Sequence, residues 1–193
     1  FPLLFSCDEY ELSDDQQQSF VKFYGAGLQD EGIKVLTTDD GFLIMGNIEN
    51  MERGKDICLI RTDKYGNSIA PITVLGGQYD DYGYAIEPNT DGYIIAGSSR
   101  RTKYGDLDVF LAQVDTAGDT LWTNTYGRSY DDEAYDILIR DDGHIVLTGY
   151  SDGGDITKSD FLVIETDEVG NQLKFYNSDQ SFEEVAYSII EYG

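Results

Sequence analysis

The phrase TDGYIIAGSS, Thr90 to Ser99, decides the fold because it recurs along the chain. Close variants run from Asp39 to Asn47 (DDGFLIMGN) and from Asp141 to Tyr150 (DDGHIVLTGY). Each begins with an Asp-Gly turn signal and continues into a short apolar run. We expect the Asp-Gly pair to join two antiparallel strands, with glycine supplying a positive φ. The glycine after the apolar run, Gly97 in the first phrase, is expected at a bulge or a close backbone approach.

Other markers repeat at the same interval, which is 51 or 52 residues. Three Asp residues of this spacing each begin an Asp-x-x-Gly turn, in DKYGN, DTAGD and DEVGN. The repeated markers are Gly25, Gly76 and Gly127, and Asp63, Asp115 and Asp167. Markers kept in one order over so long a stretch indicate internal duplication.

One period contains four strand-like segments and no helix of 10 to 12 residues. The segments are YAIEP (84–88), YIIAGS (93–98), VFLAQVD (109–115) and TLWTNTYG (120–127). Four strands in about 50 residues are typical of one propeller blade. The sequence therefore predicts an all-β fold, a β-propeller built of four-stranded blades with a 51–52-residue repeat.

The predicted blades do not fill a closed ring. Three complete blades are expected at about 31–75, 82–126 and 133–176. An outer strand at 18–24 precedes them, and the start of a further blade follows at 182–193. Propellers close with four to eight blades. Either the chain belongs to a longer protein, or assembly with another chain closes the propeller.

The repeat unit resembles the bacterial β-propeller repeats of secreted and cell-surface proteins that are abundant in the Bacteroidetes. The resemblance is carried by VLGGQYDDYGYAIEPNTDGYIIAG with DVFLAQVDTAG, and by TYGRSYDDEAYDILIRDDGHIVLTG with DFLVIETDEVG. These shared residues build turns and strands. The resemblance therefore implies architecture and an extracytoplasmic location, and it says little about activity.

The N-terminus carries a second resemblance. LLFSC, Leu3 to Cys7, resembles the lipobox of a bacterial lipoprotein, and the acidic DEYE that follows resembles a surface-export tag. This implies lipidation of Cys7, and residues 1–17 would then be the tail of a signal peptide and a polar tether. Three acyl chains would anchor the protein stably in the outer membrane, at the cell surface. The alternative is a buried apolar segment with a free cysteine.

Charge excludes one class of partner. Thirteen basic residues face 37 acidic residues, for a formal net charge of −24 at pH 7. Such a charge repels a phosphate backbone, so nucleic-acid binding is not expected. The charge favours solubility, and carboxylates are also the ligands that Ca²⁺ prefers. We expect no cofactor, with bound Ca²⁺ left open.

The few histidines and cysteines restrict the chemistry further. One histidine, His144, and two cysteines, Cys7 and Cys58, do not suffice for a typical His/Cys metal site. Cys58 lies in the apolar run DICLIRTD and is expected in the core, although a Cys7–Cys58 disulfide stays open.

Binding residues are expected on the longer loops at one end of the blades, because the tight turns leave little room at the other end. The first candidate group is basic and aromatic: Arg100, Arg101, Lys103 and Tyr104. It would suit an acidic partner or a sugar, and the alternative is an ordinary solvated loop. The second group is Tyr79, Asp80 and Asp81 with Tyr130, Asp131 and Asp132, which would ring the channel mouth. These Asp residues would hold Ca²⁺ or a polar ligand, or else cap turns and tie blades together.

Repetition accounts for most of the notable residues without any chemistry. We therefore expect a non-catalytic binding or scaffolding lipoprotein of the cell surface, whose propeller face engages a glycan or a protein partner in an outer-membrane complex. One alternative is a polysaccharide-active enzyme, although chance alone supplies paired carboxylates in so acidic a chain. Another alternative is a structural spacer stabilised by Ca²⁺. No Ser-His-Asp arrangement is expected from the single histidine.

Overall fold

The computed structural model describes residues 21–25, 29–103, 105–128, 130–152, 159–178 and 182–192, and these form three four-stranded antiparallel sheets. The first sheet contains β1 (Glu31–Thr37), β2 (Gly41–Asn50), β3 (Gly54–Asp63) and β4 (Thr73–Leu75). The second contains β5 (Asp81–Asn89), β6 (Gly92–Arg100), β7 (Leu107–Asp115) and β8 (Thr120–Tyr126). The third contains β9 (Asp132–Ile139), β10 (Ile145–Asp152), β11 (Ser159–Thr166) and β12 (Gln172–Asn177). The prediction of repeated four-stranded units is confirmed; a closed ring is not shown.

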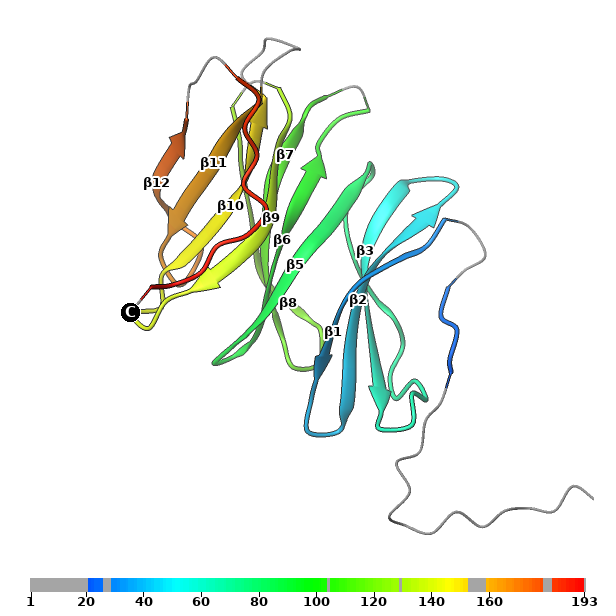
Figure 1. The fold of residues 1–193 in the computed structure, drawn as a ribbon. Helices are drawn as coiled ribbons and strands as arrows, with labels where there is room; N and C mark the ends of the chain where they lie inside the picture. The colour runs from blue at the N-terminus through cyan, green and yellow to red at the C-terminus, as the bar shows by residue number, and fades with distance from the viewer. Residues whose placement is uncertain are drawn as a thin grey trace, which may run out of the picture.

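Strand order follows chain order in every sheet, so each sheet is a simple meander. The turns between first and second strands and between third and fourth strands lie at one end, which we call the turn end. The connections between second and third strands, and those between sheets, lie at the other end, which we call the loop end. Figure 1 shows the three sheets side by side, with the second between the other two.

The Asp-x-x-Gly turns form as predicted. The Asp63 carboxylate accepts hydrogen bonds from the backbone N–H groups of Tyr65 and Asn67, both at 2.8 Å. Asp115 and Asp167 accept the same pair of bonds in the other two sheets. Gly66 has a φ of 75° in the first of these turns, a left-handed conformation that glycine adopts without strain. These Asp residues therefore build turns.

The glycine that ends the repeated apolar run marks a close backbone approach, as predicted. A Cβ on Gly97 would overlap the carbonyl oxygen of Tyr82 on β5. The pairing of β5 with β6 shifts register at this point, between Gly83 and Ala85. Gly149 meets the carbonyl of Glu133 in the same way in the third sheet. Only glycine allows the first strand to bulge this close to the second.

Apolar layers between the sheets form the core. One layer joins the first and second sheets through residues such as Leu43, Met45, Ile95 and Phe110. A second layer joins the second and third sheets through residues such as Ile94, Leu111 and Leu162. Each strand of the second sheet sends alternate side chains into the two layers, because successive side chains point to opposite faces. The second sheet is therefore covered on both faces.

The segments at the two ends of the described chain contact the first and third sheets. The Tyr24 hydroxyl donates to the Gly66 carbonyl at 2.6 Å, and Tyr126 of β8 donates to Gly170 at the same distance. Residues 21–25 thus contact the first sheet much as β8 contacts the third, although they form no strand. Residues 182–192 run along the third sheet, where the Ala186 N–H donates to the Gly149 carbonyl (Figure 1).

Some predictions fall outside this description. The lipobox and tether at residues 1–17, with Cys7, lie outside the described residues, as does Tyr104. Within the described part of the chain, no helix is long and apolar enough to cross a lipid bilayer.

Candidate functional site

The arginines of the basic loop that is predicted as a binding site pair with nearby backbone and carboxylate oxygens. The Arg100 guanidinium donates to the Gly105 carbonyl at 2.9 Å and lies 3.8 Å from the Asp80 carboxylate. Arg101 pairs with Asp108 at 3.3 Å, and Lys103 is exposed in the same loop. Internal ion pairs therefore account for the two arginines, as the alternative of an ordinary loop expects, and ligand binding by this loop stays a prediction.

The repeated Asp pairs also hold the loop end together. Asp80 accepts from the Lys55 N–H at 3.1 Å, and Asp131 accepts from the Leu107 N–H at 2.7 Å. Each bond joins the residue just before the first strand of one sheet to the third strand of the preceding sheet. Asp81 accepts from the Gly77 N–H at 2.6 Å, and Asp132 accepts from the Arg128 N–H at 2.8 Å. Tyr79 is half-buried beside the first pair, and Tyr130 is exposed beside the second. Ligand binding by these residues stays a prediction.

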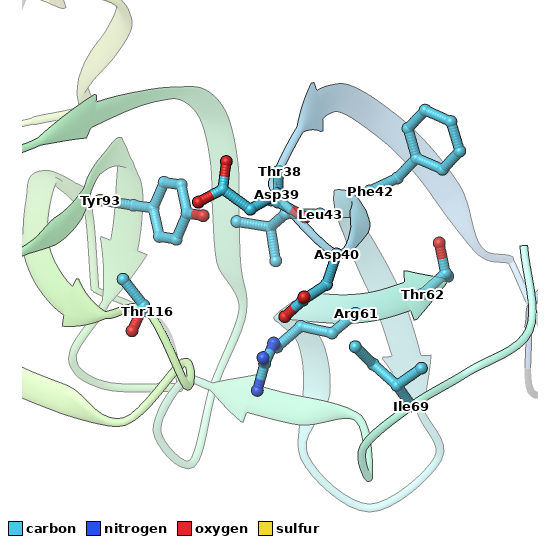
Figure 2. Close-up of a pocket in the computed structure, with 10 residues that line it drawn as sticks. All are labelled: Thr38, Asp39, Asp40, Phe42, Leu43, Arg61, Thr62, Ile69, Tyr93 and Thr116. Atoms are coloured by element: carbon cyan, nitrogen blue, oxygen red, sulfur yellow. The ribbon is translucent and has the colours of Figure 1, made fainter. Parts of the chain in front are cut away.

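A cavity of about 400 Å³ lies at the turn end, between the first and second sheets. The β1–β2 turn and β3 supply one wall, and β6 and the β7–β8 turn supply the other (Figure 2). The residues around it are Thr38, Asp39, Asp40, Phe42, Leu43, Arg61, Thr62, Ile69, Tyr93 and Thr116. This is the end at which the sequence predicted little room for a ligand. Residues of two different sheets line this cavity, which the turns of any one sheet do not reveal.

Four polar side chains around this cavity have no partner in the part of the chain that the structure describes. Among the described residues, neither Asp39, Asp40, the Arg61 guanidinium nor the Tyr93 hydroxyl forms a hydrogen bond or ion pair through its side chain. Figure 2 shows Asp40 and Arg61 on the wall of the first sheet and Tyr93 on the wall of the second. The cavity thus offers acceptors, a planar donor and an aromatic ring that no internal contact uses.

The turns and strands around the cavity hold these residues in place. The Asp39 and Asp40 carboxylates sit in the β1–β2 turn, which the Thr38 hydroxyl stabilises by accepting from the Gly41 N–H at 3.2 Å. Tyr93 follows Gly92 at the start of β6, in the repeated phrase that decides the fold. Phe42 and His144 occupy the same place in the other two repeats. An aromatic residue after each Asp-Gly turn was therefore a signal in the sequence for this end of the sheets.

A second group that the sequence did not predict is a tyrosine cluster around β5, β9, β10 and the segment 182–192. The Tyr84 and Tyr135 ring centroids are 5.1 Å apart, and Tyr135 stacks on Tyr187 at 5.5 Å. The Tyr150 hydroxyl donates to the buried Glu133 carboxylate at 2.9 Å. Burial is the main reason why the pKa of Tyr135 is raised above its usual value. The signal was the spacing of Tyr84, Tyr135 and Tyr187, which are 51 and 52 residues apart.

The single histidine belongs to an ion-pair network. His144 Nδ1 lies 3.1 Å from the Glu165 carboxylate, and Arg140 lies 3.3 Å from the same oxygen. Lys174 also contacts Glu165, and its hydrogen bond is the main reason why the pKa of Glu165 is lowered. A carboxylate held this firmly in the ionised form orients its neighbours and holds β11 to β12. No serine or cysteine nucleophile accompanies it among these contacts.

No protein-family model matches the sequence, and no curated protein matches it.

Proposed function

We propose that the chain is a non-catalytic binding module that takes a neutral oligosaccharide into the cavity at the turn end. The three sheets would be consecutive blades of a propeller, and neighbouring blades would form the two walls of the site. The observation that carries this proposal is the set of partnerless polar side chains around a cavity of about 400 Å³.

The chemistry of the cavity suits a sugar better than an apolar ligand. Asp39 and Asp40 are acceptors for sugar hydroxyls, and the Arg61 guanidinium is a planar donor that can bind two adjacent oxygens. The Tyr93 ring offers a flat surface for the apolar face of a pyranose, with a hydroxyl at its edge. The formal net charge of −24 disfavours polyanionic glycans, so the favoured ligand is neutral.

The sequence also supports a proposal for the location of this module. We propose a lipid anchor at Cys7 that would place the module at the outer surface of a bacterial cell. A protein partner in an outer-membrane complex remains the other candidate ligand, and the loop end, with Arg100 and Tyr130, would then carry the contact.

Binding of the purified chain to an array of neutral oligosaccharides tests the proposal, followed by calorimetric titration of the best ligand. We expect binding without release of a shortened product, since no catalytic group is assigned. Arg61→Gln and Tyr93→Phe should each weaken the affinity at least about tenfold, because each removes hydrogen bonds to the ligand.

Matched controls separate the cavity from the rest of the surface. Arg140→Gln removes an arginine at the turn end that already pairs with Glu165, and Tyr65→Phe removes the hydroxyl of an exposed tyrosine. Both controls should bind as the unmodified chain does. If Arg61→Gln and Tyr93→Phe also leave the affinity unchanged, the cavity is not the site. Release of a product would favour the enzyme alternative.

A further inference from the structure

A pair of carboxylates lies between the first and second sheets near the loop end, and the same pair recurs between the second and third. In each pair one acid comes from the third strand of a sheet and the other from the first strand of the next. An exposed glycine lies beside each pair. The members are Asp56, Asp81 and Gly76 at the first junction, and Asp108, Asp132 and Gly127 at the second.

The two junctions share one geometry, atom for atom. A Cβ on Gly76 would lie within 3.0 Å of Asp56 Oδ1 and of Asp81 Oδ2. A Cβ on Gly127 would lie within 3.0 Å of the corresponding oxygens of Asp108 and Asp132. The two carboxylates of a pair therefore converge on one small region, and the missing side chain keeps that region open toward solvent.

Three of the four carboxylates are buried, Asp108 being partly exposed, and their hydrogen bonding is incomplete. Asp56 is 1% exposed, and neither of its carboxylate oxygens accepts a hydrogen bond. Asp132 is 0% exposed; its Oδ2, which faces Gly127, accepts from the Arg128 N–H, and its Oδ1 has no hydrogen-bond partner. Glu184, which follows Asp132 by 52 residues, likewise has a buried oxygen without a partner. Buried carboxylates normally have every strong acceptor position satisfied. Asp56 Oδ1 has no hydrogen-bond partner and faces the region beside Gly76, so it points to a missing ligand at the first junction, whose geometry the second junction repeats.

Neighbouring charges leave each pair negative. Arg53 lies 3.4 Å from Asp56 Oδ2, and Arg101 lies 3.3 Å from Asp108 Oδ2. The first junction thus has one arginine for two carboxylates, whereas Arg128 adds a second positive charge near Asp132 at the second junction. The side chains of Arg53 and Arg101 are about half exposed. Other acids lie close by, because Asp80 and Asp106 each raise the pKa of a junction carboxyl. Burial is the main reason why the pKa values of Asp56, Asp81 and Asp132 are raised, although Ser151 lowers that of Asp132.

We propose that each of these two carboxylate pairs binds one divalent cation, Ca²⁺ by its chemistry, and that the ion ties neighbouring sheets together. Hard oxygen ligands in an irregular arrangement favour Ca²⁺ over Mg²⁺, which demands near-octahedral geometry. Within the described residues no group of three or more His, Cys, Asp or Glu side chains is placed to hold a metal. Backbone carbonyls and water would complete the shell, so the affinity should be in the millimolar range typical of extracellular Ca²⁺ modules.

This cation would act on stability, because its ligands come from two sheets. A ligand that binds only the folded state raises the free energy of unfolding by mass action. The inference does not depend on glycan binding, since the pairs lie near the loop end and the proposed glycan cavity lies at the turn end.

The experiment compares the thermal unfolding midpoint of the full chain in EDTA and in about 10 mM CaCl₂, a concentration above the expected dissociation constant, at about pH 7.5 and equal ionic strength. We expect Ca²⁺ to raise the midpoint by about 3 °C or more. Asp81→Asn with Asp132→Asn should abolish the shift, because asparagine still accepts the backbone hydrogen bonds but carries no charge. Asp91→Asn, in an exposed turn, is the matched control and should keep the shift.

A further variant distinguishes a site from general screening of charge. Arg53→Gln removes the cation that competes at the first junction, so it should enlarge the Ca²⁺-dependent shift. The proposal is overturned if the unmodified chain shows no shift, or if the Asp81→Asn and Asp132→Asn variant keeps it. It is also overturned if Arg53→Gln reduces the shift, because Arg53 would then support the pair rather than compete with an ion.

Discussion

Gly97→Ala should be one of the most destabilising single-methyl additions in this protein. Gly97 lies in the central strand region of the second sheet, where the Tyr82 carbonyl of β5 occupies the space that a Cβ would need. β5 cannot move away freely, because Tyr82 and Ala85 lie in a strand that packs against both neighbouring sheets.

The magnitude follows from the displacement. Real Cβ atoms essentially never lie under 3.0 Å from another heavy atom, so β5 would have to retreat by more than about 1 Å. Overpacking a well-filled core costs about 1–3 kcal/mol. The retreat would also weaken one or two ladder hydrogen bonds, at about 1 kcal/mol each. We expect a total loss of about 2–5 kcal/mol in the free energy of unfolding.

Alanine substitutions at two other glycines should cost less stability than Gly97→Ala. A Cβ on Gly46 would lie 2.5 Å from the Glu31 carbonyl on β1, an edge strand that can shift, so Gly46→Ala should cost about 1–2 kcal/mol. Gly32 has nothing within 4 Å, so Gly32→Ala should stay within about 0.5 kcal/mol. Urea unfolding followed by circular dichroism and by Trp122 fluorescence measures all three. Equal stabilities of Gly97→Ala and Gly32→Ala would refute the close approach.

Three further predictions rest on buried polar groups. Asn47→Ala should cost about 2–3 kcal/mol, because the Asn47 amide both accepts from the Gly83 N–H at 2.8 Å and donates to its carbonyl across the first junction; a loss below about 0.5 kcal/mol in urea unfolding would contradict this. Burial raises the pKa of the Cys58 thiol to about 11, so in a Cys7→Ser background it should not react with a thiol reagent at pH 8 until the protein unfolds. Because the folded state holds this proton more tightly than the unfolded state, stability should also fall as the pH rises from about 9 to 11. Burial likewise raises the pKa values of the Asp81 and Asp132 carboxyls, so in EDTA these groups should raise the unfolding midpoint in urea as the pH falls from neutral to mildly acidic values. A falling midpoint would contradict the assignment.

The sequence predicted the repeated sheets because their signals are local. Asp63 and its equivalents form the same turn in every copy through hydrogen bonds within five residues. Glycine occurs at position 97 because the adjacent strand leaves no room for a Cβ there. Strand positions such as 109–115 match β7, Leu107–Asp115, because alternation and turn residues bound them closely.

The candidate sites were less predictable because they join residues of different sheets. The spacing of Gly25, Gly76 and Gly127 was visible, but its reason, a carboxylate pair supplied by two sheets, depends on how the sheets pack. Arg100 and Asp80 were both singled out by type, yet the structure pairs them with each other. The sequence does not predict the Arg61 cavity, because its two walls come from different sheets and each turn signal concerns one sheet.

The most direct test of the account is the affinity of the purified chain for its best neutral oligosaccharide, measured by calorimetry with Arg61→Gln beside Arg140→Gln. The account predicts saturable binding that Arg61→Gln weakens at least about tenfold and Arg140→Gln leaves unchanged. Equal affinity of the two variants, or no binding to any neutral oligosaccharide on the array, would contradict it.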